Sequence, residues 1–208
     1  MHLPQNSGPV QRIFMSQFWI YFGIGREHIL DLNGYDHILF VIALCAIYIL
    51  QDWKRVLILV TAFTIGHSVT LALSTLDIIN VRTDLIEFLI PVTIMITAIA
   101  NLFKTKQTLT KTRMTMNYAF ALFFGLIHGM GFSNYLKSIL GKEDSIVSPL
   151  LAFNLGLELG QIIIVVFFMV ASFVFVSLFS VQRRDWNLII SSAVAGMALM
   201  LMIDAKFW

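Results

Sequence analysis

The sequence is poor in charge and in cysteine. Asp, Glu, Lys and Arg together make up 12% of its 208 residues, about half of the share that is usual in soluble domains. The net charge of +2 is too small to indicate binding of nucleic acid. A single cysteine, Cys45, excludes an internal disulfide and any CxxC metal or redox motif. We therefore expect neither a water-soluble domain nor a nucleic-acid partner.

Hydrophobic residues dominate what is present. They make up 58% of the chain, and the mean hydropathy is +0.84. A membrane-spanning helix needs about 20 predominantly apolar residues. Six runs reach or approach that length, at roughly 36–50, 56–76, 85–103, 116–136, 150–180 and 187–204. They lack the alternating pattern of membrane β-strands, so we predict an all-α, polytopic membrane helix bundle of about six transmembrane helices.

The N-terminal segment has a different pattern. In residues 10–24, the aromatic residues Phe14, Phe18, Tyr21 and Phe22 fall on one face of a helix. This pattern is typical of an amphipathic helix that lies along the membrane surface, although a short seventh span also fits. We predict that residues 1–27 form a tail and this interfacial helix, and that residues 28–208 form a single transmembrane domain.

The basic residues between the runs indicate an orientation. Loops 51–55, 104–115 and 181–186 contain eight Lys and Arg residues, and the opposite side contains six. Short loops rich in Lys and Arg tend to remain in the cytoplasm. We therefore expect these three loops in the cytoplasm and both chain termini outside it.

Several ionisable residues interrupt the apolar runs. Such side chains are costly in hydrocarbon and usually have a function. Successive spans cross the membrane in opposite directions. Residues early in the odd-numbered spans therefore lie at the same depth in the bilayer as residues late in the even-numbered spans. Under this topology six residues fall in the outer half of the bilayer, with His28 just before the first span: Asp36, His37, His67, Glu87, His128 and Glu158. We therefore predict one shared polar site.

The residue types of this set point to a metal. Imidazoles and carboxylates without thiolates suit a borderline divalent transition metal, and no Lys or Arg is available to neutralise the carboxylates. Three further polar residues could orient the ligands: Ser68, Asn154 and Gln161. Structural roles are also open, since Asp36 and the Asp84–Glu87 pair could cap helices. His67 or His128 could simply bond a neighbouring helix.

Five segments carry a resemblance to a known family: EHILDLNGYDHILF (27–40), FTIGHSVTLAL (63–73), Glu87, GLIHGMGFS (125–133) and FNLGLELGQ (153–161). In these the chain resembles the HupE/UreJ family of multi-pass membrane proteins, named for hydrogenase and urease accessory functions. Because Glu27-His28-Ile29 stands where nickel-associated members have a histidine-proline motif, it is closer to a second branch. The resemblance implies a bacterial inner-membrane protein for nickel or cobalt uptake. The metal-handling residues it implies are His28, Asp36, His37, His67, Glu87, His128 and Glu158.

Three functions fit these observations. The first is transport of a nickel-type metal ion, with nickel or zinc as the expected ion and the lipid bilayer as surroundings. The second is an intramembrane zinc-dependent hydrolase acting on a lipid-like substrate, with Glu87 or Glu158 as general base and Ser68 as a positioning group. The third is a membrane scaffold that contains a structural metal. A homo-oligomer is compatible with all three.

Overall fold

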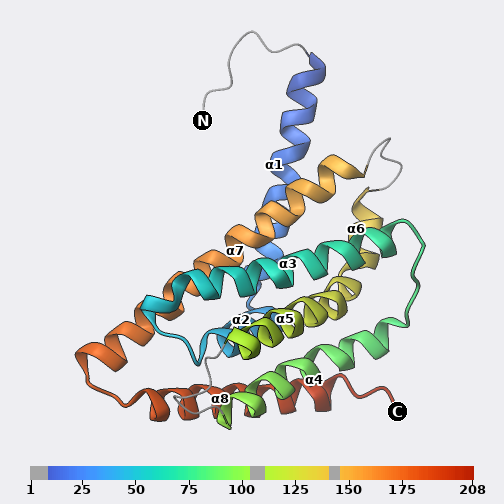
Figure 1. Ribbon diagram of the computed structural model, residues 1–208. Helices are drawn as coiled ribbons and strands as arrows, with labels where there is room; N and C mark the ends of the chain where they lie inside the picture. Colours follow the sequence, from blue (N-terminus) through green and yellow to red (C-terminus); the bar gives the residue numbers. More distant parts are fainter. Residues whose placement is uncertain (1–8, 104–110, 141–145) are drawn as a thin grey trace.

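The computed structural model describes residues 9–103, 111–140 and 146–208, and in these residues all regular secondary structure is helical, without β-strands (Figure 1). This confirms the predicted all-α membrane bundle. The elements are α1 (Pro9–Leu30), α2 (Asp36–Cys45), the 3₁₀ turn η1 (Leu50–Asp52), α3 (Trp53–Thr75), α4 (Thr83–Leu102), α5 (Lys111–Gly131), α6 (Ser133–Leu140), α7 (Val147–Phe173), the π-helical turn η2 (Val174–Leu178) and α8 (Arg183–Asp204).

Four segments of the described chain are long and apolar enough to cross a membrane by themselves: Leu50–Thr75, Thr83–Leu102, Val147–Leu178 and Arg183–Asp204. A fifth span results if Thr115–Gly131 and Ser133–Leu140, which are bent by 51°, are counted together. The chain is thus a multi-pass membrane protein, and five of the expected runs correspond to these segments.

The first expected run, 36–50, differs from the prediction. Its helix, α2, has only ten residues, about 15 Å of helix, or half of the hydrocarbon thickness. Before α2 stands α1, which extends to Leu30 and so continues beyond the expected interfacial segment. The predicted domain boundary at residue 27 falls inside α1, and the division into two parts stays a prediction.

Two pairs of parallel helices pack with their backbones in contact. A Cβ atom added to Gly125 of α5 would lie 2.1 Å from the Phe63 carbonyl oxygen of α3, and one on Gly129 would lie 2.3 Å from that of His67. Both contacts have the same sequence offset, which shows that α3 and α5 run in the same direction. Such close approach of small residues is a common way to pack membrane helices.

The second pair, α1 and α7, repeats this arrangement. A Cβ atom on Gly156 would lie 2.0 Å from the Phe22 carbonyl oxygen, and one on Gly160 would lie 3.2 Å from that of Arg26. The N-terminal half of α1 extends beyond the other helices (Figure 1), whereas its C-terminal half enters the bundle beside α7. This packing brings the end of α1 to the centre of the molecule.

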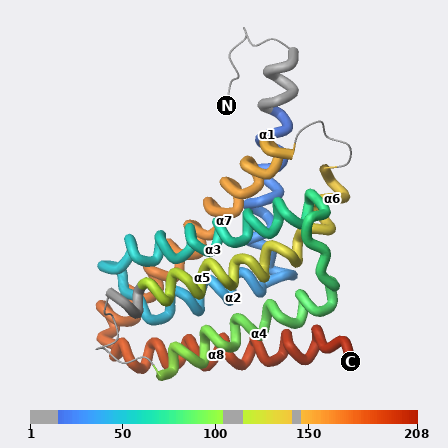
Figure 2. The backbone as a smooth tube through the Cα atoms, turned by 45° about the vertical axis from the view of Figure 1, so that its right-hand side comes forward, coloured from blue at the N-terminus to red at the C-terminus, as the bar shows by residue number. Residues whose placement is uncertain are grey.

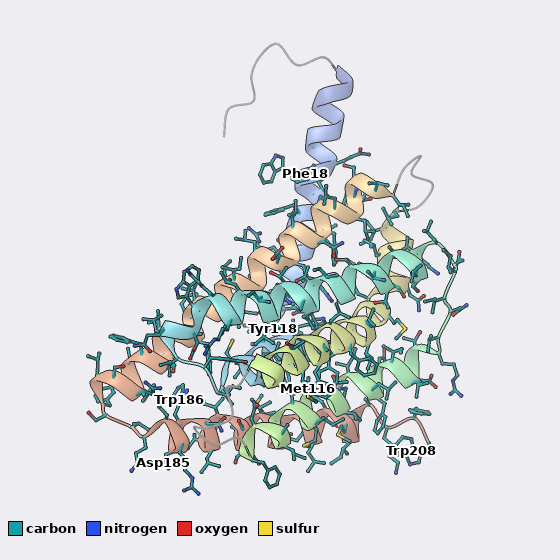
Figure 3. The ribbon with its side chains drawn as sticks, viewed as in Figure 1. Phe18, Met116, Tyr118, Asp185, Trp186 and Trp208 are labelled. Carbon is teal, nitrogen blue, oxygen red and sulfur yellow. The ribbon has the colours of Figure 1, made fainter. Side chains whose placement is uncertain are left out.

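The remaining helices form the other side of the bundle. Helices α4 and α8 lie side by side, with α2 and α5 between them and α3 and α7 (Figure 2). At the corner where α7 leads into α8, the ring centroid of Trp186 lies 5.8 Å from that of Phe168 and 5.3 Å from that of Phe175 (Figure 3). These rings pack the start of α8 against the end of α7 and against η2.

Candidate metal centre

The centre is built around the break between α1 and α2. Helix α1 ends at Leu30 and α2 begins at Asp36. In the connecting turn the Asn33 backbone N–H donates to the Asp31 carboxylate at 2.9 Å, as is typical of an Asx turn. This short connection places His28, in the last turn of α1, with its ring centroid 4.6 Å from that of His37, in the first turn of α2.

Two neighbouring helices add further histidines to this break. The ring centroid of His67, on α3, lies 6.1 Å from those of both His28 and His37. Ligand-capable atoms of these three residues all lie within 4.8 Å of one another. On α5, the ring centroid of His128 lies 5.1 Å from that of His37, although His128 is outside the group of three whose ligand atoms lie within 4.8 Å of one another. Small side-chain rotations could place these nitrogens on one ion, for which metal–nitrogen distances are about 2.0–2.1 Å.

Hydrogen bonds fix two of the rings in the orientation that a metal requires. His128 Nδ1 lies 2.9 Å from the Phe124 carbonyl oxygen, which can only accept, so Nδ1 carries the proton. His37 Nδ1 lies 2.9 Å from Asp36 Oδ1, and the carboxylate again makes it the donor. In the neutral form of both rings the lone pair is therefore on Nε2. A carboxylate or carbonyl behind a histidine is the usual support of a metal ligand.

The free nitrogens of the four rings are buried. Nε2 of His28, His37 and His128, and both ring nitrogens of His67, have no hydrogen-bond partner among the described residues. His67 and His128 are each 0% exposed. Buried polar atoms are nearly always paired, so a group of unpaired nitrogens at one place indicates a binding site.

Phenylalanine side chains surround this cluster. The ring centroid of Phe132 lies 3.9 Å from that of His28, and that of Phe40 lies 5.0 Å from that of His128. Phe63 and Phe153 approach His37 and His67 at 6.3 Å and 6.2 Å, respectively. These rings exclude water and lower the local dielectric constant, which strengthens the interaction between a cation and the imidazoles. The sequence gives no separate signal for these four phenylalanines.

The structure does not bring two of the predicted carboxylates to the histidines. Glu87 is exposed on α4, whereas its neighbours Ile86 and Ile90 are buried in the core. Glu158, on α7, accepts a hydrogen bond of 2.8 Å from the Thr61 hydroxyl of α3. Neither belongs to the group whose ligand atoms lie within 4.8 Å of one another. A metal-binding role for these two carboxylates stays a prediction, without support in this geometry.

The three residues expected to orient ligands lie with Glu158 rather than with the histidines. The Ser68 hydroxyl donates to the Thr64 carbonyl oxygen at 2.6 Å, and the Asn154 amide donates to the Leu150 carbonyl oxygen at 2.8 Å. Gln161 Oε1 accepts from the Thr64 hydroxyl at 2.7 Å. Thr61 and Thr64 were not expected to take part. Their helical spacing with Ser68 is the signal that could have identified them.

Comparison with known proteins bears on this arrangement. The family described as "HupE / UreJ protein" matches residues 5–206, nearly the whole chain. No curated protein and no solved structure matches the chain significantly. The matched range includes all four clustered histidines and both parallel helix pairs. The chain therefore belongs to the HupE/UreJ family of membrane proteins.

Proposed function

We propose that the chain binds a divalent transition metal ion of the nickel or zinc type at the four-histidine cluster and carries it across the membrane as cargo. The observation that supports this most directly is the set of buried imidazole nitrogens without partners, contributed by α1, α2, α3 and α5. The proposed ligands are His28, His37, His67 and His128, and Asp36 orients His37.

The donor set supports this class of ion. Neutral imidazole suits zinc, nickel, copper and iron, whereas magnesium and calcium prefer oxygen ligands. In the described chain, the Cys45 thiol is buried in the core and is not part of the cluster, so soft thiolate ligation is not offered there. We therefore expect nickel or zinc to bind in preference to magnesium.

Transport is favoured over hydrolysis by the position of the site. Many transporters hold substrates beside short or broken membrane helices, and this cluster lies at the start of the short apolar helix α2. A cavity of about 130 Å³, lined in part by Tyr48, Asn101 and Asn117, lies toward the C-terminal ends of α2 and α4. It would provide space for an ion leaving the cluster in that direction.

Hydrolysis would need a general base beside the metal. The two candidates, Glu87 and Glu158, are respectively exposed and hydrogen-bonded to Thr61, and the Ser68 hydroxyl donates to its own helix. Neither candidate base therefore lies beside the histidines, so the geometry supports transport better than hydrolysis. A purely structural metal is separated from transport by the uptake experiment below.

The orientation remains part of the proposal. We propose a bacterial inner membrane, with the loops rich in Lys and Arg in the cytoplasm and both termini outside. The supporting observation is the distribution of basic residues along the sequence, together with the positive-inside tendency of short loops. Labelling of single cysteines introduced at either terminus, from one side of intact cells, tests it.

The decisive experiment combines metal binding with uptake. Purified protein is titrated with nickel and zinc by calorimetry, and proteoliposomes are tested for uptake of radioactive nickel. We expect His67→Ala to weaken metal binding by roughly tenfold or more and to abolish uptake. His2→Ala, outside the family motifs, is the matched control and should behave like the unmodified chain. Absence of metal binding would overturn the site. Tight nickel binding without uptake of radioactive nickel would overturn nickel transport and leave a structural metal.

A further inference from the structure

A second polar site lies between α3 and α7. A groove of about 270 Å³ is lined by five polar side chains: Thr61, Thr64, Ser68, Asn154 and Glu158. Four apolar residues form its rim, and Ile65 and Leu151 among them are more than half exposed. The groove therefore has a polar floor and an apolar border facing the surroundings of the bundle.

This groove is distinct from the histidine cluster. Both touch α3, but the fully buried His67 has its ring among those of His28, His37 and Phe153, whereas the adjacent Ser68 lines the groove. On α7, Phe153 packs against the histidines, whereas Asn154 and Glu158 line the groove. No histidine contributes to its lining.

The groove contains one carboxylate without a cationic partner. Among the described residues, Glu158 forms no ion pair, and its carboxylate accepts a hydrogen bond of 2.8 Å from Thr61. An unpaired carboxylate within a membrane span is costly. Asn154 Oδ1, one helical turn away on the same helix, is buried and has no hydrogen-bond partner either. Glu158 thus lacks a positive partner in the groove, and Asn154, which also lines it, has an acceptor oxygen without a donor.

We propose that this groove binds a monovalent hard cation of the sodium type. Its donors are all oxygens: one carboxylate, three hydroxyls and one amide oxygen. Oxygen donors suit hard cations and lack the imidazole nitrogen that nickel and zinc favour. A single carboxylate balances the charge of one monovalent cation, which leaves the occupied groove electrically neutral.

Size and position agree with this occupant. A water molecule takes up about 30 Å³ of liquid volume, so a groove of about 270 Å³ has room for a partly hydrated ion. Thr61, Thr64 and Ser68 lie in the middle of the apolar segment Leu50–Thr75. Coupling ions of secondary transporters bind at this depth. The inference does not rest on the proposed metal transport, because it uses none of the histidines.

Binding of radioactive sodium to the purified protein, with choline as the replacement cation at constant ionic strength, tests the proposal. We expect saturable binding that nickel does not displace. Glu158→Gln retains the shape and should lower sodium affinity by roughly tenfold or more, because it removes the only charged ligand. Thr61→Val should lower it less. Asp204→Asn, at the exposed end of α8, is the charge-matched control and should bind like the unmodified chain.

Folding is checked independently. Each variant should still bind zinc at the histidine cluster with unchanged stoichiometry, which separates loss of the groove from loss of the fold. Failure of zinc binding in all proteins, with sodium binding intact, would overturn the metal proposal and leave this one standing. Absence of saturable sodium binding, or equal binding by Glu158→Gln, would overturn the sodium site. Proton uptake by Glu158 without sodium binding would likewise overturn it.

Discussion

Substitution of Gly125 by alanine is the sharpest test of the packing that assembles the histidine cluster. The added Cβ atom would lie 2.1 Å from the Phe63 carbonyl oxygen and 3.1 Å from the His67 backbone nitrogen. Ordinary contact begins near 3.4 Å, and these are backbone atoms, so a side-chain rotation cannot relieve the clash. The helices α3 and α5 must therefore separate by about 1 Å. Close-packed protein interiors resist a displacement of this size.

The expected cost follows from this separation. Overpacking lowers the free energy of unfolding by about 1–3 kcal/mol. Because the clash here is with backbone atoms, we take the upper value, about 3 kcal/mol. Alanine recovers about 1 kcal/mol because its helix propensity exceeds that of glycine. The net loss in the free energy of unfolding is then about 2 kcal/mol, equivalent to roughly a 30-fold change in the folded-to-unfolded ratio.

Reversible unfolding by SDS in mixed micelles measures this loss. Gly196→Ala on α8 is the matched control, because a Cβ atom there meets nothing within 4 Å, and it should gain up to about 1 kcal/mol from helix propensity. Gly125→Ala should also weaken zinc binding, since the separation moves His67 relative to His128. If Gly125→Ala were as stable as Gly196→Ala, the reasoning about backbone contact between α3 and α5 would be refuted.

Two further substitutions test individual hydrogen bonds. Asp36→Asn removes the negative charge behind His37 Nδ1, and we expect zinc affinity to fall about 10–100-fold in a calorimetric titration; unchanged affinity would contradict the orienting role. Asn101→Leu removes the amide that donates to the Ala43 carbonyl oxygen at 2.7 Å. It should lower the free energy of unfolding by about 1–3 kcal/mol in the SDS titration, and equal stability would show that this bond is dispensable.

Long uninterrupted apolar runs could be predicted well from the sequence. The expected spans 56–76 and 187–204 differ by only a few residues from α3 and α8. The run 36–50 has a similar composition, yet its helix ends at Cys45. The placement of this short helix depends on how α1 packs beside it. That packing requires Gly25 to meet the backbone of Phe153, and a contact between residues so distant in sequence leaves no local signal.

The site could be predicted only in part, for a geometric reason. The alternation of spans fixes the depth of a residue in the bilayer, and for His37, His67 and His128 depth was sufficient to indicate a common site. Depth does not fix the direction in which a side chain leaves its helix. Glu87 and Glu158 were assigned to the same level, but rotation of α4 and α7 about their axes turns both carboxylates elsewhere. That rotation is set by interhelical packing, which residue spacing does not reveal.

The separation of the carboxylates from the histidines has an electrostatic consequence for the proposed transport. Asp36 is the one carboxylate that contacts the histidine cluster among the residues that the structure describes. With that single neighbour, a divalent ion would retain one excess positive charge, which a low-dielectric surrounding penalises. A site completed by Glu87 and Glu158 would carry one excess negative charge and hold the ion far more tightly. A transported ion must leave its site as well as enter it. A closed site with more negative charge than the ion has positive charge would oppose that release. Under the proposed transport, four imidazoles with one supporting carboxylate would therefore release a metal ion more readily than a site completed by both glutamates.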